Sequence, residues 1–293
     1  MLARSSSSAH GAERRIVGEP AWLRVVLIGL ALTAITVLIV IPVVNVFWQA
    51  LAAGFGVYLK NLWRDPDTRH AIRLTLTVAP LAVVVNTLCG IATAWVVTRF
   101  SFPGKSLLVS LLDLPFAVSP VVAGLMLVLL FGRQGYLGPL LQGWGIKVIF
   151  AWPALVLATT FVTIPFVARE LIPLMQSLGP DEELAALSLG ASPWQMFRLV
   201  TLPNIRWALL FGIIQCNARA MGEFGAVYVV SGRIAHETDT MPLRVEKLFQ
   251  EYNNPGSFAV ASLLTLMALA TLALKRWLEH RAQAETPPTQ EPA

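Results

Sequence analysis

Residues 180–203 read PDEELAALSLGASPWQMFRLVTLP, and this stretch separates two long apolar runs. It opens with a proline and three acidic residues, which suit the first turn of a helix because negative charge complements the helix dipole there. Gly190 can adopt the positive φ that ends a helix, and Ser192-Pro193 is typical of the start of another. The stretch therefore predicts two short helices joined by a sharp bend, the second ending at Leu202-Pro203.

Apolar runs dominate the rest of the chain. Hydrophobic residues make up 56% of the 293 residues and charged residues only 13%, well below the roughly 25% charged of soluble proteins. A lipid bilayer is the natural solvent for such a chain. Six runs are long enough to span it: Val25–Trp48, Leu74–Val97, Ser106–Phe131, Val148–Ala168, Trp207–Val230 and Ser257–Leu274. The sequence predicts an all-α membrane protein with six transmembrane helices.

The remaining segments set the expected organisation. Residues 1–21 and 278–293 are polar and are expected to be disordered tails around a membrane domain over 22–277. The first run is too long for a cleaved signal peptide. Six spans place both termini on one side, and a small excess of Lys and Arg marks that side, together with the loop 169–206, as cytoplasmic.

The bent stretch resembles the EAA loop of ABC importer permeases. In that family Glu-Ala-Ala is followed after three residues by Gly, and after nine more by Ile-x-Leu-Pro. Matching positions are Ala185, Ala186, Gly190, Leu202 and Pro203, and Val200 stands for the isoleucine. Leu184 occupies the position of the family's glutamate. Either Glu183 partly replaces that glutamate, or the charged contact that it makes with the ATPase is lost.

The resemblance implies a type I ABC importer permease (MetI-like) fold, with a cytoplasmic coupling helix-turn-helix that docks on a separate ATPase. The residues expected at that contact are Glu182, Glu183, Ala185, Ala186, Gly190, Ala191, Pro193, Phe197, Leu202 and Pro203. The chain has no Gly-x-x-x-x-Gly-Lys-Ser/Thr phosphate loop. We therefore expect no catalysis and no bound cofactor in this chain, with ATP and Mg on the partner ATPase.

Two further stretches point to oxyanions. Residues 218–225 resemble the oxyanion branch of these permeases, sulfate and molybdate alike, and residues 231–253 resemble CysW-type subunits of sulfate/thiosulfate importers. The resemblance implies a bacterial inner-membrane complex with a second, CysT-type permease, two CysA-type ATP-binding subunits and an extracytoplasmic sulfate-binding protein. No residue chemistry separates sulfate from molybdate.

Arg219 and Glu223 are charges within the predicted fifth span. They lie four residues apart, so on a helix they share a face and can pair. Gly222 between them allows a close approach of a second helix. The arginine either lines the pathway and attracts an anion or belongs to a structural ion pair, and we favour the structural role because conduction needs weak binding.

The predicted third span carries a single charge, Asp113, followed by a proline-rich segment that is similar to the family's segment near the pore. An acid repels sulfate, so Asp113 is expected to pair with a cation or to cap broken backbone. Ser119, with amides freed near Pro120, is expected to contact a passing oxyanion.

Other classes of protein fit less well. The net charge is +5, but no basic stripe indicates nucleic-acid binding. His236-Glu237 is a poor ligand set for a metal. A secondary transporter usually shows two related halves, and we find no internal repeat.

Overall fold

The computed structural model describes residues 21–285, which fall into two units divided between Val46 and Phe47. The first unit holds α1 (Ala21–Ile35), the π-helix η1 (Thr36–Val40) and the start of α2 (Ile41–Ala52). Most of its described side chains are apolar and exposed, as expected for a helix surrounded by lipid. The candidate span over these elements is Trp22–Ala52, somewhat longer than the predicted Val25–Trp48.

All regular secondary structure in the described residues of the second unit, 47–285, is helical. After α2 its elements are α3 (Phe55–Trp63), α4 (Pro66–Arg99), α5 (Lys105–Ala117), α6 (Pro120–Phe131), α7 (Gly138–Gly143), α8 (Trp152–Thr163), α9 (Pro165–Leu178), α10 (Asp181–Ser188), α11 (Pro193–Met196), the π-helix η2 (Phe197–Thr201), α12 (Leu202–Met221), α13 (Gly225–Ser231), α14 (Met241–Gln250) and α15 (Asn254–Glu285). Over residues 21–285, five helical stretches are long and apolar enough to cross a membrane, or six when the bent pair α5 and α6 counts as one. The predicted all-α membrane fold is confirmed.

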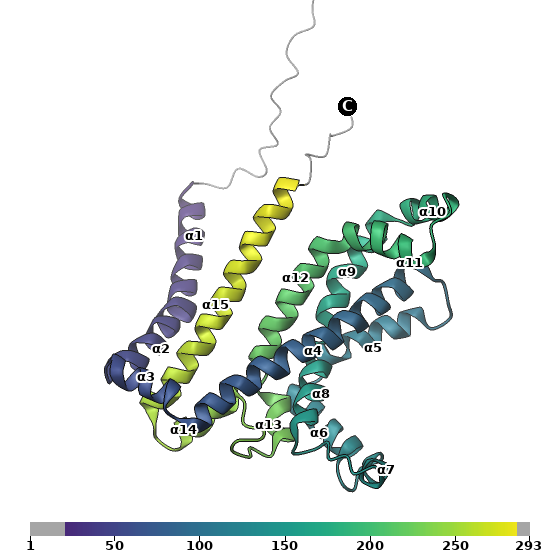
Figure 1. Cartoon of the computed structure of the whole chain (residues 1–293). Coiled ribbons are helices and arrows are strands. Elements are labelled where there is room, and N and C mark those ends of the chain that lie inside the picture. Colours follow the sequence, from purple (N-terminus) through teal and green to yellow (C-terminus); the bar gives the residue numbers. More distant parts are fainter. Residues whose placement is uncertain (1–20, 286–293) are drawn as a thin grey trace, which may run out of the picture. The chain divides into compact units, whose positions relative to one another are not determined.

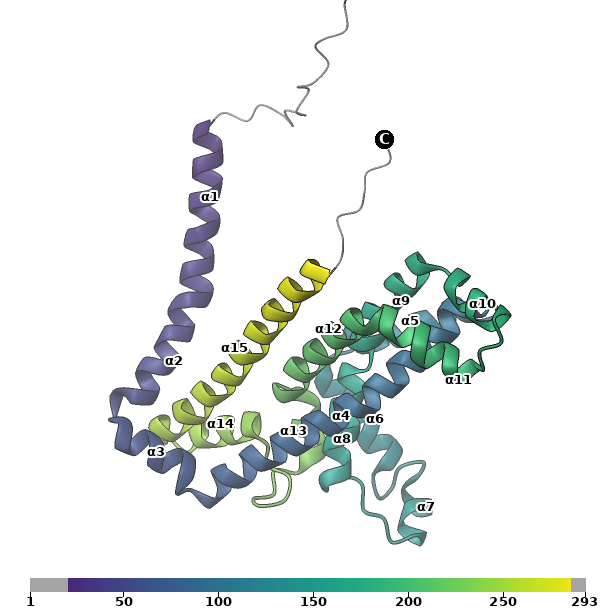
Figure 2. The same ribbon diagram turned by 45° about the horizontal axis from the view of Figure 1, so that its top comes forward.

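Helix α4 is the longest element of the second unit, with 34 residues. It packs against α8, α9 and α12, and Figures 1 and 2 show α10 and α11 near one of its ends and α14 near the other. Small residues let these helices approach closely: a Cβ added to Gly90 of α4 would meet Val167 of α9 at 2.7 Å, and one on Gly212 of α12 would meet the same residue at 3.1 Å. This contact lies in a buried core shared by three spans.

The predicted third span is not one straight helix. It is the pair α5 and α6, bent by 112° at residues 118–119. Ser119 is extended because it precedes Pro120, whose ring disfavours the helical conformation for the residue before it. Val118 is extended as well, and the run of apolar residues gives no sign of the break.

The later predicted spans need correction at their ends. The fourth runs over Trp152–Leu178, so the predicted loop 169–206 begins inside α9. The predicted fifth span, Trp207–Val230, is interrupted, since α12 ends at Met221 and α13 begins at Gly225. Helix α15 continues to Glu285, where a disordered tail from 278 was expected. The predicted tail over 1–21 lies outside the described residues except for Ala21.

Candidate functional site

The bend predicted in residues 180–203, here called the bent segment, is built by helix-capping chemistry. Gly190 has φ +89°. Its amide donates to the carbonyl of Leu187 at 3.0 Å, and the amide of Ala191 donates to the carbonyl of Ala186 at 3.1 Å. These two bonds form the Schellman motif that ends α10, which needs a left-handed residue at the glycine position. The motif positions Ala186, Gly190 and Ala191 therefore shape the bend itself.

The next helix begins as the sequence predicts. Ser192 accepts a hydrogen bond from the Gln195 amide at 3.3 Å, and the Gln195 side chain accepts one from the Ser192 amide at 2.8 Å. This is a complete capping box, with Pro193 at the first helical position. Both short helices thus have satisfied ends at the bend.

The predicted end of this helix at Leu202-Pro203 is wrong. Helix α11 passes through η2 into α12 without a break. Proline removes a hydrogen bond to the preceding turn, and the wider π-turn of η2 directly before it accommodates that loss. The first unit has the same arrangement, with η1 directly before Ile41-Pro42. The bent segment is therefore a continuous extension of the spanning helix α12.

Glu183 fastens the bent segment to the C-terminal end of α4. Its Oε2 accepts from Arg99 Nε at 2.6 Å, while its Oε1 accepts from Arg99 Nη2 at 3.0 Å and from Thr201 Oγ1 at 2.9 Å. Arg99 also donates to the carbonyl of Met175 in α9 at 3.0 Å. Only 11% of the arginine side chain and 10% of the glutamate side chain are exposed. Glu183 therefore points inward and is not presented at the surface as the family's glutamate would be.

The outer surface of the bent segment is apolar. Leu184, Leu189, Trp194 and Leu199 are all more than half exposed, with Leu189 at 89%. Phe197 lies beneath, stacked on Trp194 with ring centroids 5.8 Å apart. Of the other residues expected to face the ATPase, Glu182 accepts a hydrogen bond from Asn204, Ala185 and Pro203 are exposed, and Leu202 is half-buried. Exposed apolar groups gathered on a short, well-capped element are typical of a surface that meets a partner protein or a membrane.

Arg219 and Glu223 are paired, as predicted, with Nη1 and Oε2 2.7 Å apart. They do not share one helix, because α12 ends at Met221 and Gly222 follows it. The Glu223 side chain is 1% exposed, and its Oε1 accepts from the amide of Ala226 at 3.0 Å, in the first turn of α13. This carboxylate holds α12 and α13 together, which agrees with the structural role.

Asp113 also has a cation partner, as expected. Its Oδ1 accepts from Arg169 Nε in α9 at 2.8 Å. Ser119 is exposed and makes no side-chain capping bond to α6. Pro120 packs elsewhere, since a Cβ added to Gly225 of α13 would meet its Cβ at 3.0 Å. The expected pathway residues thus fall into two groups, one beside α9 and one beside α13.

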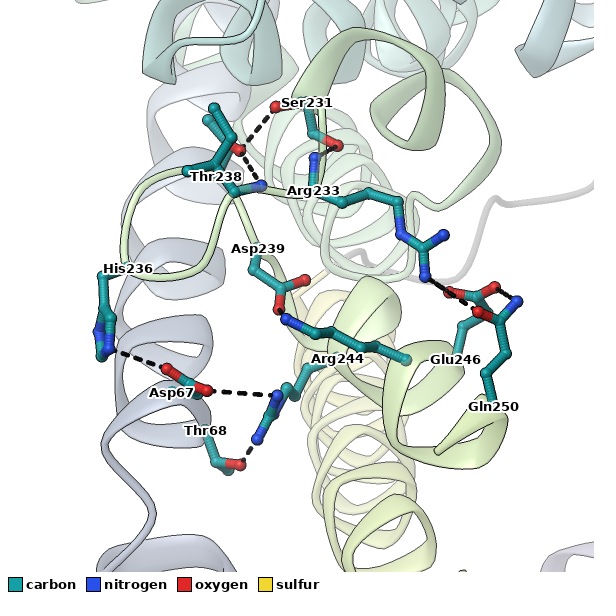
Figure 3. Close-up of polar contacts among 12 residues, drawn as sticks. Asp67, Thr68, Ser231, Arg233, His236, Thr238, Asp239, Arg244, Glu246 and Gln250 are labelled. Atoms are coloured by element: carbon teal, nitrogen blue, oxygen red, sulfur yellow. Dashed lines mark hydrogen bonds and ion pairs between the residues drawn. The ribbon is translucent and has the colours of Figure 1, made fainter. Parts of the chain in front are cut away.

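A second polar cluster holds the N-terminal end of α4, and Figure 3 shows most of its members. Asp65 caps the helix by accepting from the Asp67 amide. Its carboxylate also binds Arg244 of α14 at 2.7 Å. Asp67 contacts Arg244 at 3.5 Å and His236 at 2.9 Å. These long-range pairs were not predicted, because nothing in the local sequence connects the α4 cap to α14.

Two acids at this end have shifted pKa values in opposite directions. Burial tends to raise the pKa of Asp65, but hydrogen bonds from Thr68 and Arg244 outweigh it and hold that pKa below its usual value. Burial raises the pKa of Asp239 above its usual value, and the Lys247 amine, 4.0 Å away, offsets this only in part. Both Asp239 carboxylate oxygens are buried without a hydrogen-bond partner in the described part of the chain.

The chain is similar to known membrane transport proteins. Residues 86–284 match the sequence family described as "Binding-protein-dependent transport system inner membrane component". The chain is 54% identical to the sulfate transport system permease protein CysW of Escherichia coli K12, over 89% of this chain and 90% of that one. It is 35% identical to the sulfate transport system permease protein CysT of the same organism, over 87% of this chain and 91% of that one.

A solved structure shares the fold. A chain of a bacterial ABC transporter involved in the import of the acidic polysaccharide alginate superimposes with a TM-score of 0.73 at 17% identity, covering 91% of this chain and 96% of that one. At this identity the likeness concerns the arrangement of helices alone.

Proposed function

Because the chain belongs to the family of inner membrane components of binding-protein-dependent transport systems, we propose that it is the membrane-spanning permease subunit of an ATP-driven sulfate importer. It carries sulfate, and thiosulfate as a second substrate, inward across the bacterial plasma membrane. Support for the substrate comes from the 54% identity to a sulfate permease over most of both chains. The chain itself binds no nucleotide, and ATP with Mg is held by the partner ATPase.

The bent segment carries this proposal. It is capped at both sides of the bend, fastened to α4 through Glu183, and continuous with α12 through η2. An ATPase that covers its exposed apolar side can therefore push on two spanning helices at once. A rigid element with two firm connections transmits a movement that a flexible loop would absorb.

The partners follow from the same proposal. A second, CysT-type permease completes the pathway, two ATP-hydrolysing subunits of the CysA type bind the bent segments, and an extracytoplasmic sulfate-binding protein delivers the anion. Both termini and the bent segment lie on the cytoplasmic side. The matching CysT sequence, 35% identical, fits a pair of related permeases derived from one ancestor.

The test is reconstitution of the whole complex. A tagged chain is co-expressed with its candidate permease and ATPase partners, purified, and placed in proteoliposomes with the binding protein outside. We expect the ATPase to co-purify and labelled sulfate to enter only with ATP. Substituting the catalytic acid of the partner ATPase should stop uptake and leave the complex assembled. Uptake that continues, or an ATPase that never co-purifies, contradicts the proposal.

A further inference from the structure

The ion pair between Arg169 and Asp113 joins two helices, α9 and α5, and is more open to its surroundings than the interhelical Arg99–Glu183 pair. Side chains are 54% exposed for the arginine and 37% for the aspartate. In the Arg219–Glu223 pair, by contrast, the carboxylate is 1% exposed and already serves α13. The Arg169 pair is therefore the one whose arginine can exchange its partner without dismantling a helix contact.

Both groups lie within candidate membrane spans, Arg169 in Trp152–Leu178 and Asp113 in the bent pair of α5 and α6. Helix α5 rises about 12 Å from Lys105 to Asp113, and α9 rises about 13 Å from Arg169 to Leu178, at 1.5 Å per residue. A charged pair at that depth is too costly to expose to lipid and normally faces water or protein inside a bundle. The exposed side of this pair therefore lines a watery path or meets a partner subunit.

Arg169 has donors to spare. Only its Nε bonds to Asp113, and Phe116 lies against the guanidinium with its ring centroid 4.7 Å from Cζ. Its two terminal nitrogens have no hydrogen-bond partner within residues 21–285. A guanidinium presents its donors as a planar fork that suits two oxygens of one oxyanion. The stacking on Phe116 holds that fork in place.

We propose that Arg169 is the side chain that the transported oxyanion contacts inside the membrane, with Asp113 as a resident counter-anion that the substrate displaces. The inference rests on the proposed function and adds a specificity-determining residue to it. When the substrate leaves, Asp113 recovers the guanidinium. This competition keeps the anion weakly held, and conduction requires that the anion can leave as readily as it enters.

Removing the charge of Arg169 should then reduce transport more than removing the charge of Asp113. In the reconstituted complex, Arg169→Gln should lower the maximal rate of sulfate uptake at least about tenfold, because it leaves an uncompensated carboxylate that repels the substrate. Asp113→Asn should cost no more than about threefold, since it retains the cation. Arg169→Lys should fall between the two, because lysine keeps the charge but loses the planar fork. Co-purification of the ATPase should be unchanged in all three, because both side chains are partly exposed and their substitution leaves no buried cavity. Equal losses for Arg169→Gln and Asp113→Asn would indicate a structural ion pair and overturn the proposal.

Chemical labelling provides an independent readout. With the exposed Cys89 replaced by serine, Arg169→Cys is treated in the assembled complex with charged methanethiosulfonate reagents. We expect the aminoethyl reagent, which adds a positive charge, to restore uptake, and the negatively charged sulfonatoethyl reagent not to restore it. Sulfate present during turnover should slow the reaction of the cysteine with either reagent. A cysteine that never reacts is covered by lipid or a partner, which rejects the proposal. If the unmodified complex takes up no sulfate, the proposed function has failed, whereas normal uptake with Arg169→Gln rejects this inference alone.

Discussion

Both ends of α4 bind distant segments of the chain through charged side chains, but the two sets of contacts differ. Each end carries charges that complement the helix dipole, acids at the N-terminus and an arginine at the C-terminus. Each uses them to hold a distant segment: Arg99 binds Glu183, 84 residues away, and Asp65 binds Arg244, 179 residues away. A single helix thus connects the bent segment to α14.

The two clusters differ in how completely their hydrogen bonds are satisfied. At the C-terminal end both oxygens of Glu183 are bonded to Arg99, and Thr201 adds a third bond. At the N-terminal end Arg244 is shared by two acids, and both oxygens of the buried Asp239 lack a hydrogen bond. A fully satisfied buried network is rigid, whereas a partly satisfied one has alternatives. We infer that the bent segment moves with α4 as one body, while the opposite cluster can rearrange.

Glu183→Ala should have the largest effect, because it leaves Arg99 buried without its partner. Breaking a buried ion pair from one side costs about 3–5 kcal/mol. We expect the bent segment to detach, to become sensitive to added protease, and to lose its ATPase. The double variant Arg99→Met with Glu183→Met removes both charges and should retain more of the ATPase than Glu183→Ala. If the double variant is the weaker binder, the ion pair is not what holds the segment.

Arg244→Met tests the other end and should cost less, about 1.5–3 kcal/mol, the scale of hydrogen bonds to charged groups. Its partners Asp65 and Asp67 have side chains 28% exposed, so water can partly replace the arginine. The expected result is a lower midpoint of thermal unfolding in detergent, with ATPase co-purification unchanged. Glu251→Ala, in an exposed turn, is the control and should not shift the midpoint. Loss of the ATPase without any change in the midpoint would mean that the two ends are not independent.

Gly190→Val should weaken the bend through backbone strain alone. A Cβ at this position meets no atom within 4 Å, so the penalty comes from φ +89°, about 1–3 kcal/mol for a β-branched residue. We expect reduced sulfate uptake and reduced binding of the ATPase. Gly190→Asn should be milder, because asparagine tolerates positive φ better. Valine and asparagine variants with equal activity would show that the bend does not depend on this conformation.

The smallest effect expected is that of Asp239→Asn, and it should depend on pH. Since burial raises the pKa of Asp239 in the folded state, its contribution to stability is full below the unfolded pKa and is lost as pH rises through the folded pKa. The unfolding midpoint of the variant should therefore rise relative to that of the unmodified protein as pH rises. In acid the two midpoints should converge. Asp65, whose pKa is lowered, is present in the variant and in the unmodified protein, so its contribution cancels when their unfolding midpoints are subtracted. Unfolding midpoints measured from about pH 4 to about pH 8 span the relevant range, and a constant difference would contradict the assignment.

The features that were predicted from the sequence depend on residues close together in the chain, and those that were missed depend on residues far apart. The bend at Gly190 and the Ser192 cap were both predicted, because each depends on residues within one turn of the backbone. The helical membrane class was also predictable, since apolar runs of that length have few other ways to satisfy their backbone groups.

The packed structure alone decided where helices break and which charges meet. Leu202-Pro203 reads as a helix end, yet the π-turn before it lets α12 continue; the apolar fifth run reads as one span, yet it stops at Met221. Glu183 was expected to partly replace the family's glutamate or to leave the charged contact with the ATPase lost, and it is instead the buried partner of Arg99. Such outcomes depend on groups far away in the chain, which approach one another only when the helices are packed.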